Sequence, residues 1–94
     1  MTIYDQIAIK IIKEQALLMG PVAWNEAGKV DGLKIDSKVG EVSILQANDG
    51  GLIINKLVDR FGHLFGRAGR EVCKEAVNAL IADMQPSQIP SSLR

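Results

Sequence analysis

Three glycines interrupt the longest amphipathic stretch of the chain, residues 52–84, at Gly62, Gly66 and Gly69. Apolar side chains recur through this stretch at helical spacing, which predicts helix on both sides of the glycines. The apolar face does not keep the same direction around the helix axis, however. The face that holds Phe61 is displaced by roughly a third of a turn, at about 100° per residue, from the face that holds Val77.

Two arrangements of this stretch are compatible with the glycines. In one, a single helix runs through it, and the glycines line one side and let another helix come close. In the other, the helix breaks between Gly66 and Gly69. We favour the break, because the apolar face rotates and each interior glycine costs about 1 kcal/mol relative to alanine. The sequence therefore predicts helices over 52–65 and 68–84, with a positive φ at Gly66 or Gly69.

The first part of the chain predicts another pair of helices. Residues 3–19 carry apolar side chains at helical spacing after Thr2, which suits the N-cap position. Gly20 and Pro21 then end this helix and begin a shorter one over 21–30. Apolar residues also lie outside the main stripe of the first helix. That pattern is typical of a central helix, or of one half of an oligomer interface.

One polar residue, Gln15, falls within the apolar face of the 3–19 helix. A buried amide that bonds to neighbouring backbone explains its position, because buried amides usually find such partners. A polar contact that sets the register across a dimer is the other explanation. We favour the first.

The segment between the helical pairs predicts a small β-hairpin. Residues 33–36 and 41–45 alternate with period two around a connection that contains Gly40. Because two strands alone are marginally stable, the hairpin must pack on helices or pair with another copy of the chain. The fold class is therefore α+β, mainly helical, in one domain over 1–84. Two prolines and three serines in residues 85–94 predict a disordered tail.

Six basic residues recur at alternating spacings of four and three, which places them on one face of a continuous helix. They are Lys56, Arg60, His63, Arg67, Arg70 and Lys74. A stripe of one sign is a candidate anion-binding surface. A solvated face is the plainer interpretation, and a break at the glycines divides the stripe between two helices.

The segment from Gly66 to Arg70 is the most specific part of this basic stripe. A helix that begins here offers free backbone N–H groups to an anion, and Arg67 and Arg70 add charge and bidentate donors. The alternative is that these arginines pair with Glu71 or Glu26. The candidate anion-binding or partner-binding residues are Arg60, His63, Arg67, Arg70 and Lys74.

The sequence shows no complete catalytic, metal or cofactor motif. One cysteine, Cys73, and one histidine, His63, are too few for a zinc site. The glycines near Gly66 lack the lysine and hydroxyl residue of a P-loop. Eleven basic and eleven acidic residues balance, which argues against nucleic acid as a partner. No uncharged run is long enough to span a bilayer, so no membrane partner is expected.

These features predict a small non-enzymatic interaction or regulatory module that acts through protein–protein contacts and self-associates as a homodimer. The alternative function is binding of nucleic acid or a phosphoanion through the basic stripe. The third possible function is that of a small enzyme with a pocket between the helical pairs.

A single cysteine excludes an intrachain disulfide. The first residues lack the positive region of a secretory signal, so we expect a cytoplasmic protein.

Overall fold

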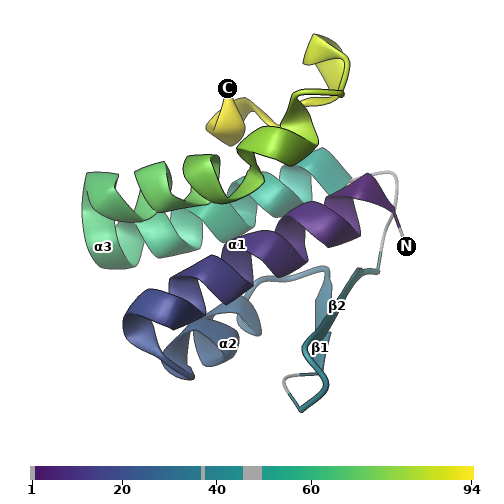
Figure 1. Cartoon of the computed structure of the whole chain (residues 1–94). Helices are drawn as coiled ribbons and strands as arrows, with labels where there is room; N and C mark the ends of the chain where they lie inside the picture. The colour runs from purple at the N-terminus through teal and green to yellow at the C-terminus, as the bar shows by residue number, and fades with distance from the viewer. Residues whose placement is uncertain (1, 37, 46–49) are drawn as a thin grey trace.

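The computed structural model describes residues 2–36, 38–45 and 50–94, and Figure 1 shows how its elements are arranged. The elements are α1 (Ile3–Met19), α2 (Val22–Ala27), β1 (Leu33–Asp36), β2 (Glu41–Ile44), α3 (Gly50–Ile81), and the 3-10 helices η2 (Pro86–Gln88) and η3 (Ser91–Leu93). The predicted fold class, α+β and mainly helical, is confirmed. Among these residues, no helix combines the length and hydropathy needed to cross a membrane.

Local signals in the sequence set both ends of α1. The N–H of Asp5 donates to Thr2 Oγ1 at 3.2 Å, and the N–H of Thr2 donates to Asp5 Oδ2 at 3.0 Å. This capping box satisfies two backbone donors at the helix start. Gly20 ends the helix with a φ of 73°, which favours glycine. The prediction of a helix over 3–19 with Thr2 as N-cap is confirmed.

α3 is a helical hairpin rather than one straight helix. Gly66, with φ 63° and ψ −144°, separates two arms, residues 50–65 and 67–81. The arms run side by side in Figure 1. The predicted break is confirmed, and Gly66 is the glycine that carries the positive φ. The second helix differs in its limits from the predicted 68–84, because it begins directly after Gly66 and ends at Ile81.

Gly62 and Gly69 allow the two arms to approach each other closely. A Cβ on Gly69 would lie 2.7 Å from the carbonyl oxygen of Phe61, and one on Gly62 would lie 2.6 Å from Arg70 Nε. Both distances are shorter than a real Cβ contact. The continuous helix is therefore wrong, although the close approach of another helix that it expected does occur: Gly66 makes the turn, and Gly62 and Gly69 make room for packing.

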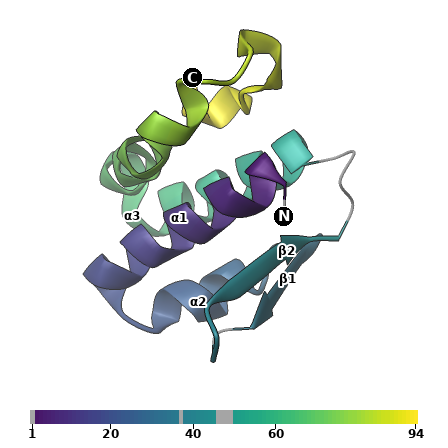
Figure 2. The same cartoon turned by 45° about the vertical axis from the view of Figure 1, so that its right-hand side comes forward.

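α1 occupies the centre of the fold, with α3 on one side and α2 with the hairpin on the other (Figures 1 and 2). Completely buried side chains of α1 and α3 form the middle of the core: Ile7, Ala8, Ile11, Ile12, Ile54, Leu57, Val58, Phe61, Cys73 and Val77. This central position explains why α1 is apolar on more than one side. Leu17 is an exception, since it is 78% exposed.

The hairpin packs on the helices, as one of the two predicted arrangements requires. Leu33 of β1 and Val42 of β2 are buried in the core, and the N–H of Ile44 donates to Asp5 Oδ1 in α1 at 2.8 Å. β2 ends at Ile44, one residue earlier than predicted. Residues 46–49, which follow in the sequence, lie outside the described residues.

α2 is shorter than the helix predicted over 21–30, because the chain leaves it after Ala27 through a series of turns. The N–H of Val30 donates to the carbonyl of Ala27 at 3.1 Å, and that of Leu33 donates to the carbonyl of Val30 at 3.3 Å. These turns redirect the chain from α2 into β1.

The C-terminal residues differ from the disordered tail predicted for 85–94. They form η2 and η3, and Leu93 is buried in the core. Asn55 of α3 holds this segment, because its Oδ1 accepts the N–H of Ser92 at 3.0 Å. The Tyr4 hydroxyl also donates to the carbonyl of Gln88 at 2.9 Å. Prolines and serines suggest disorder locally, whereas these anchors come from residues far away in the sequence.

Candidate functional site

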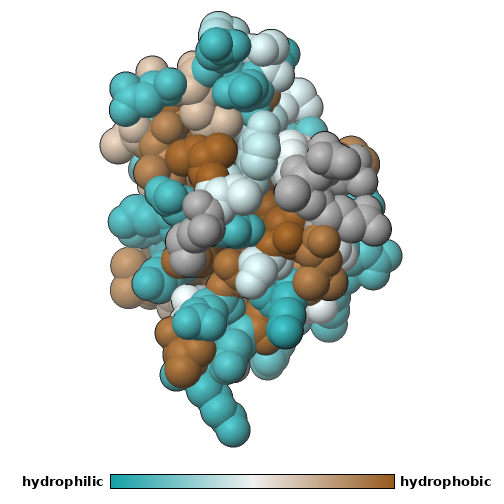
Figure 3. Space-filling model, turned by 90° about the vertical axis from the view of Figure 1, so that its right-hand side faces the viewer, coloured by the Kyte–Doolittle hydropathy of each residue, from teal (hydrophilic) through white to brown (hydrophobic). Residues whose placement is uncertain are grey.

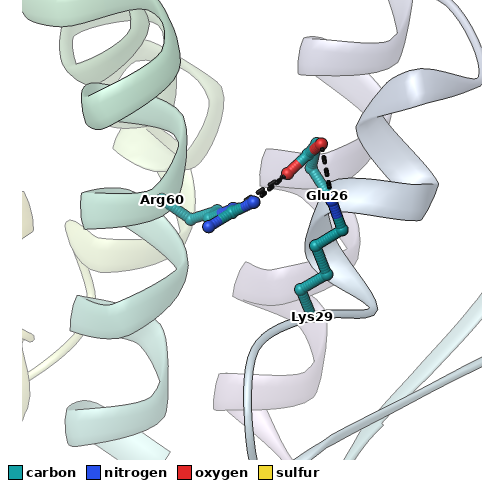
Figure 4. Close-up of polar contacts among 3 residues, drawn as sticks. All are labelled: Glu26, Lys29 and Arg60. Atoms are coloured by element: carbon teal, nitrogen blue, oxygen red, sulfur yellow. Dashed lines mark hydrogen bonds and ion pairs between the residues drawn. The ribbon is translucent and has the colours of Figure 1, made fainter.

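The basic stripe is divided by the turn at Gly66, and its first part is tied to α2. Arg60 Nε donates to Glu26 Oε2 at 2.9 Å, and Lys29 Nζ donates to Glu26 Oε1 at 3.2 Å (Figure 4). These hydrogen bonds, first from Arg60 and then from Lys29, lower the pKa of the Glu26 carboxyl. Arg60 therefore links the first arm of α3 to α2.

Arg70 links the two arms of α3 to each other. Its Nη1 donates to Asp59 Oδ1 in the first arm at 3.0 Å. The same side chain lies against Gly62, where an added Cβ would meet it. The alternative interpretation paired Arg67 and Arg70 with Glu71 or Glu26. Arg70 pairs with a carboxylate, but that carboxylate belongs to Asp59, and Glu26 pairs with Arg60 instead.

Arg67 and Lys74 complete the predicted candidate site on the second arm. Arg67 is exposed and Lys74 is half-buried, and neither makes a hydrogen bond or ion pair within the described part of the chain. Because the guanidinium of Arg70 is bonded to Asp59 in the first arm, an anion bound jointly by Arg67 and Arg70 would compete with that carboxylate. A role for Arg67 and Lys74 stays a prediction.

The structure gathers the basic residues of the first arm around a shallow depression of about 360 Å³. It is lined by Lys29, Val30, Asp31, Lys56, Arg60 and His63. Lys29 was not among the predicted residues, because nothing in its local sequence shows that α2 packs beside α3. The acids Asp31 and Glu26 accompany these bases, so the depression carries both signs of charge.

A different surface, lined by apolar side chains, lies between α1 and the second arm of α3. Leu17, Leu18 and Phe65 are 78%, 70% and 50% exposed. Figures 1 and 2 place the end of α1 and the turn of α3 at the same end of the molecule. Large exposed apolar side chains that cluster in this way mark an interaction site more often than isolated ones do.

This surface is hollowed into two adjoining cavities that share Leu18 and Val72. The smaller, about 120 Å³, is lined by Gln15, Leu18, Met19, Phe65, Ala68, Gly69 and Val72. The larger and more open one, about 420 Å³, is lined by Lys10, Glu14, Leu17, Leu18, Val72, Glu75 and Ala76. Together they form a continuous groove with α1 as one wall and the second arm as the other, and we name it the α1–α3 groove.

Gln15 lies at the wall of this groove but belongs to the core. Its Nε2 donates to the carbonyl of Gly69 at 3.0 Å and contacts Cys73 Sγ at 3.4 Å. It is 1% exposed, which fits the favoured interpretation of a buried amide bonded to backbone. The contact also ties α1 to the second arm, so it supports both walls of the groove.

The histidine and the cysteine of the chain lie in different surroundings. His63 is exposed, and burial raises the pKa of the Cys73 thiol, which disfavours the reactive thiolate. Within residues 2–36, 38–45 and 50–94, no three His, Cys, Asp or Glu side chains lie close enough to share a metal ion. The α1–α3 groove therefore offers a ligand mainly apolar contact.

Comparison of the chain with protein-family models, with curated proteins and with solved structures found no match.

Proposed function

We propose that this chain is a non-enzymatic interaction module that binds a protein partner through the α1–α3 groove. The observation that carries this proposal is the exposure of Leu17, Leu18 and Phe65 at the two adjoining cavities of this groove. Leaving such side chains in water is unfavourable by about 25 cal/mol per Å² of apolar surface, so a partner that covers them gains this free energy.

The shape of the groove favours a helix as its occupant. Both walls are helices, and a third helix packs between two helices by setting its ridges into their grooves. The small side chains of Ala68 and Ala76 in the second wall allow such a helix to come close. An amphipathic helix that lays its apolar face into a groove is an established mode of recognition.

The charges beside the groove favour a basic partner. Lys10 and Glu14 lie 3.4 Å apart and satisfy one another, whereas Glu75 forms no ion pair with a described residue. A lysine or arginine on the flank of the partner helix would complement Glu75. Charge complementarity of this kind selects and orients partners more than it adds affinity.

The proposal is tested by NMR titration of the isotope-labelled chain with a synthetic amphipathic helix that has a leucine face flanked by lysines. We expect shift changes concentrated at residues that line the groove. The same peptide with glutamates in place of the lysines should bind more weakly, because it would face Glu75. Shift changes that avoid the groove would refute the proposal.

A matched pair of variants sharpens this test. Leu18→Asp places a charge in the groove and should weaken peptide binding by about tenfold or more. Val39→Asp makes the same change at a residue of similar exposure, 64%, in the turn between the strands, and should leave binding unchanged. Equal affinity of the wild type and Leu18→Asp would exclude the groove as the binding site.

The alternative function, binding of a phosphoanion through the basic stripe, has weaker support. An anion at Arg60 would compete with Glu26, and one at Arg70 would compete with Asp59.

A cytosolic location is also part of the proposal. Its support is the single cysteine, Cys73, which is a buried free thiol of the kind that reducing compartments preserve.

A further inference from the structure

The two edges of the β-hairpin differ in their surroundings. β2 runs beside α1, and the outward N–H of Ile44 is satisfied by the carboxylate of Asp5. β1 is the strand farther from α1, and it contacts α2, the helix that precedes it in the chain (Figure 2). An open strand edge presents unpaired backbone groups, which is a template for pairing with another chain.

The hydrogen-bond pattern identifies which backbone groups of β1 point outward. The N–H of Leu45 donates to the carbonyl of Gly32 at 2.8 Å. Because hydrogen-bonded and non-bonded pairs alternate along an antiparallel ladder, Leu33 with Ile44 and Ile35 with Val42 are non-bonded pairs. The N–H and C=O groups of these residues therefore point away from the neighbouring strand.

Ile35 is the residue whose outward groups remain available at this edge. The outward N–H of Leu33 already donates to the carbonyl of Val30 at 3.3 Å. No described residue makes such a contact with the backbone of Ile35. Its N–H and C=O can exchange two hydrogen bonds with the same residue of an identical strand, if the two strands run antiparallel.

We infer that a second copy of this chain pairs with β1, so that two hairpins join into one four-stranded antiparallel sheet with Ile35 on the twofold axis. In this register, Lys34 lies opposite the partner's Asp36, and Asp36 lies opposite the partner's Lys34. Lys34 and Asp36 are both exposed and share one face of the strand. Opposite charges directly across two strands stabilise their pairing.

Charge also excludes the neighbouring registers. The outward backbone groups alternate, so the closest other twofold arrangements place the axis at Lys34 or at Asp36. The first sets Lys34 against the partner's Lys34, and the second sets Asp36 against the partner's Asp36. Like charges directly opposite are unfavourable, so the register centred on Ile35 is the one that the sequence of β1 permits.

A second observation within the hairpin supports the same pairing. Asp36 lies directly opposite Glu41, a pair of like charges on the exposed face. The partner's Lys34 on the other side of Asp36 would offset this repulsion. On the opposite face, the half-buried side chain of Ile35 would pack beside its symmetry mate, which removes apolar surface from water.

The surface on this side of the molecule is consistent with pairing through backbone hydrogen bonds. Figure 3 views the side on which the hairpin lies, and hydrophobic residues there form separate clusters among hydrophilic ones. The inference does not depend on the partner of the α1–α3 groove, which lies elsewhere on the molecule. A dimer formed through β1 would present two such grooves.

Sedimentation equilibrium of the full chain at micromolar concentration tests this inference, together with a charge swap. We expect a species of twice the 10.2 kDa monomer mass. Lys34→Asp should raise the dimer dissociation constant by about tenfold or more, because it sets like charges opposite one another at two places. Adding Asp36→Lys to this variant should restore dimerisation. Lys38→Asp, a charge reversal in the turn, is the matched control and should have little effect.

Amide hydrogen exchange of the wild type gives an independent measurement that requires no variant. The N–H of Ile35 should be protected at high protein concentration and exchange faster on dilution. A monomer throughout the concentration range overturns the inference. So does a dimer that Lys34→Asp leaves intact, a loss that the double swap does not restore, or exchange at Ile35 that is independent of concentration.

Discussion

The two arms of α3 are both amphipathic helices, but they are buried to different depths. The first arm buries Ile53, Ile54, Leu57, Val58 and Phe61 and leaves Leu52, Leu64 and Phe65 exposed near its two ends. The second arm buries Cys73 and Val77 and leaves Val72 and Ala76 half-exposed at the groove. Helical periodicity therefore marks which face of a helix is apolar, but it does not tell whether that face is covered by the same chain or is open to a partner.

The largest expected effect separates the buried part of the first arm from its exposed end at the groove, and it sets Phe61 against Phe65. Phe61→Ala removes a completely buried ring from the first arm and should lower the free energy of unfolding by about 3–5 kcal/mol. Phe65→Ala removes a ring that is 50% exposed at the groove and should cost less than about 1 kcal/mol. Urea denaturation followed by circular dichroism measures both. Equal losses would mean that the groove belongs to the core.

The packing of one arm on the other is tested at Gly69. Alanine there would place its Cβ 2.7 Å from the backbone oxygen of Phe61, so the arms must separate, at a cost of about 1–3 kcal/mol. Gly51→Ala is the matched control, since its Cβ meets nothing within 4 Å in a helix. It should stabilise the chain by up to about 1 kcal/mol. Thermal unfolding distinguishes the expected loss of stability in Gly69→Ala from the expected gain in Gly51→Ala. An unchanged stability of Gly69→Ala would contradict this close contact.

The turn between the arms is tested at Gly66, where the backbone conformation, and not a steric contact, should determine the change in stability. An added Cβ would meet nothing within 4 Å, but φ is +63°, so Gly66→Ala should cost about 1 kcal/mol or more. D-Alanine, introduced by chemical synthesis, should retain or raise stability, because the mirror image of this conformation is ordinary extended backbone. Similar losses with both enantiomers would point to a steric cause instead.

The smallest expected effect concerns the polar link between the first arm and α2. The pKa of Glu26 is lowered in the folded state from its ordinary value of 4.5, so its contribution to stability is present above that value and is lost as pH falls through the folded pKa. Glu26→Gln should therefore be less stable than the wild type at neutral pH. The difference between the two should shrink in acid. A difference in unfolding midpoint that does not change with pH would show that the charge of Glu26 is unimportant.

Features that depend on neighbouring residues could be predicted from the sequence. The capping box at Thr2 and the positive φ at Gly66 each rest on a few adjacent residues. The alternation in 33–36 likewise placed β1 correctly. These elements follow from local backbone conformation and from the periodicity of apolar side chains, which act before any distant segment is in contact.

The candidate site was predicted less completely, because charge spacing identifies a helical face and not the partners of that face. Arg60, His63, Arg67, Arg70 and Lys74 share one line only on a continuous helix, and the break at Gly66 divides them. The residues of the α1–α3 groove were not predicted, although the third alternative, a small enzyme, expected a pocket between the helical pairs. The exposed Leu17 was a possible signal, since it falls outside the main stripe of its helix.

The sequence by itself therefore determined which segments form the main helices and the strands, where α3 turns, and which faces are apolar. Tertiary structure decided that Arg60 pairs with Glu26 and Arg70 with Asp59, that Leu93 enters the core, and that Leu18 stays exposed. The physical reason is the range of the interactions. Caps, turns and periodicity act over a few residues, whereas ion pairs and burial depend on which distant segments packing brings together.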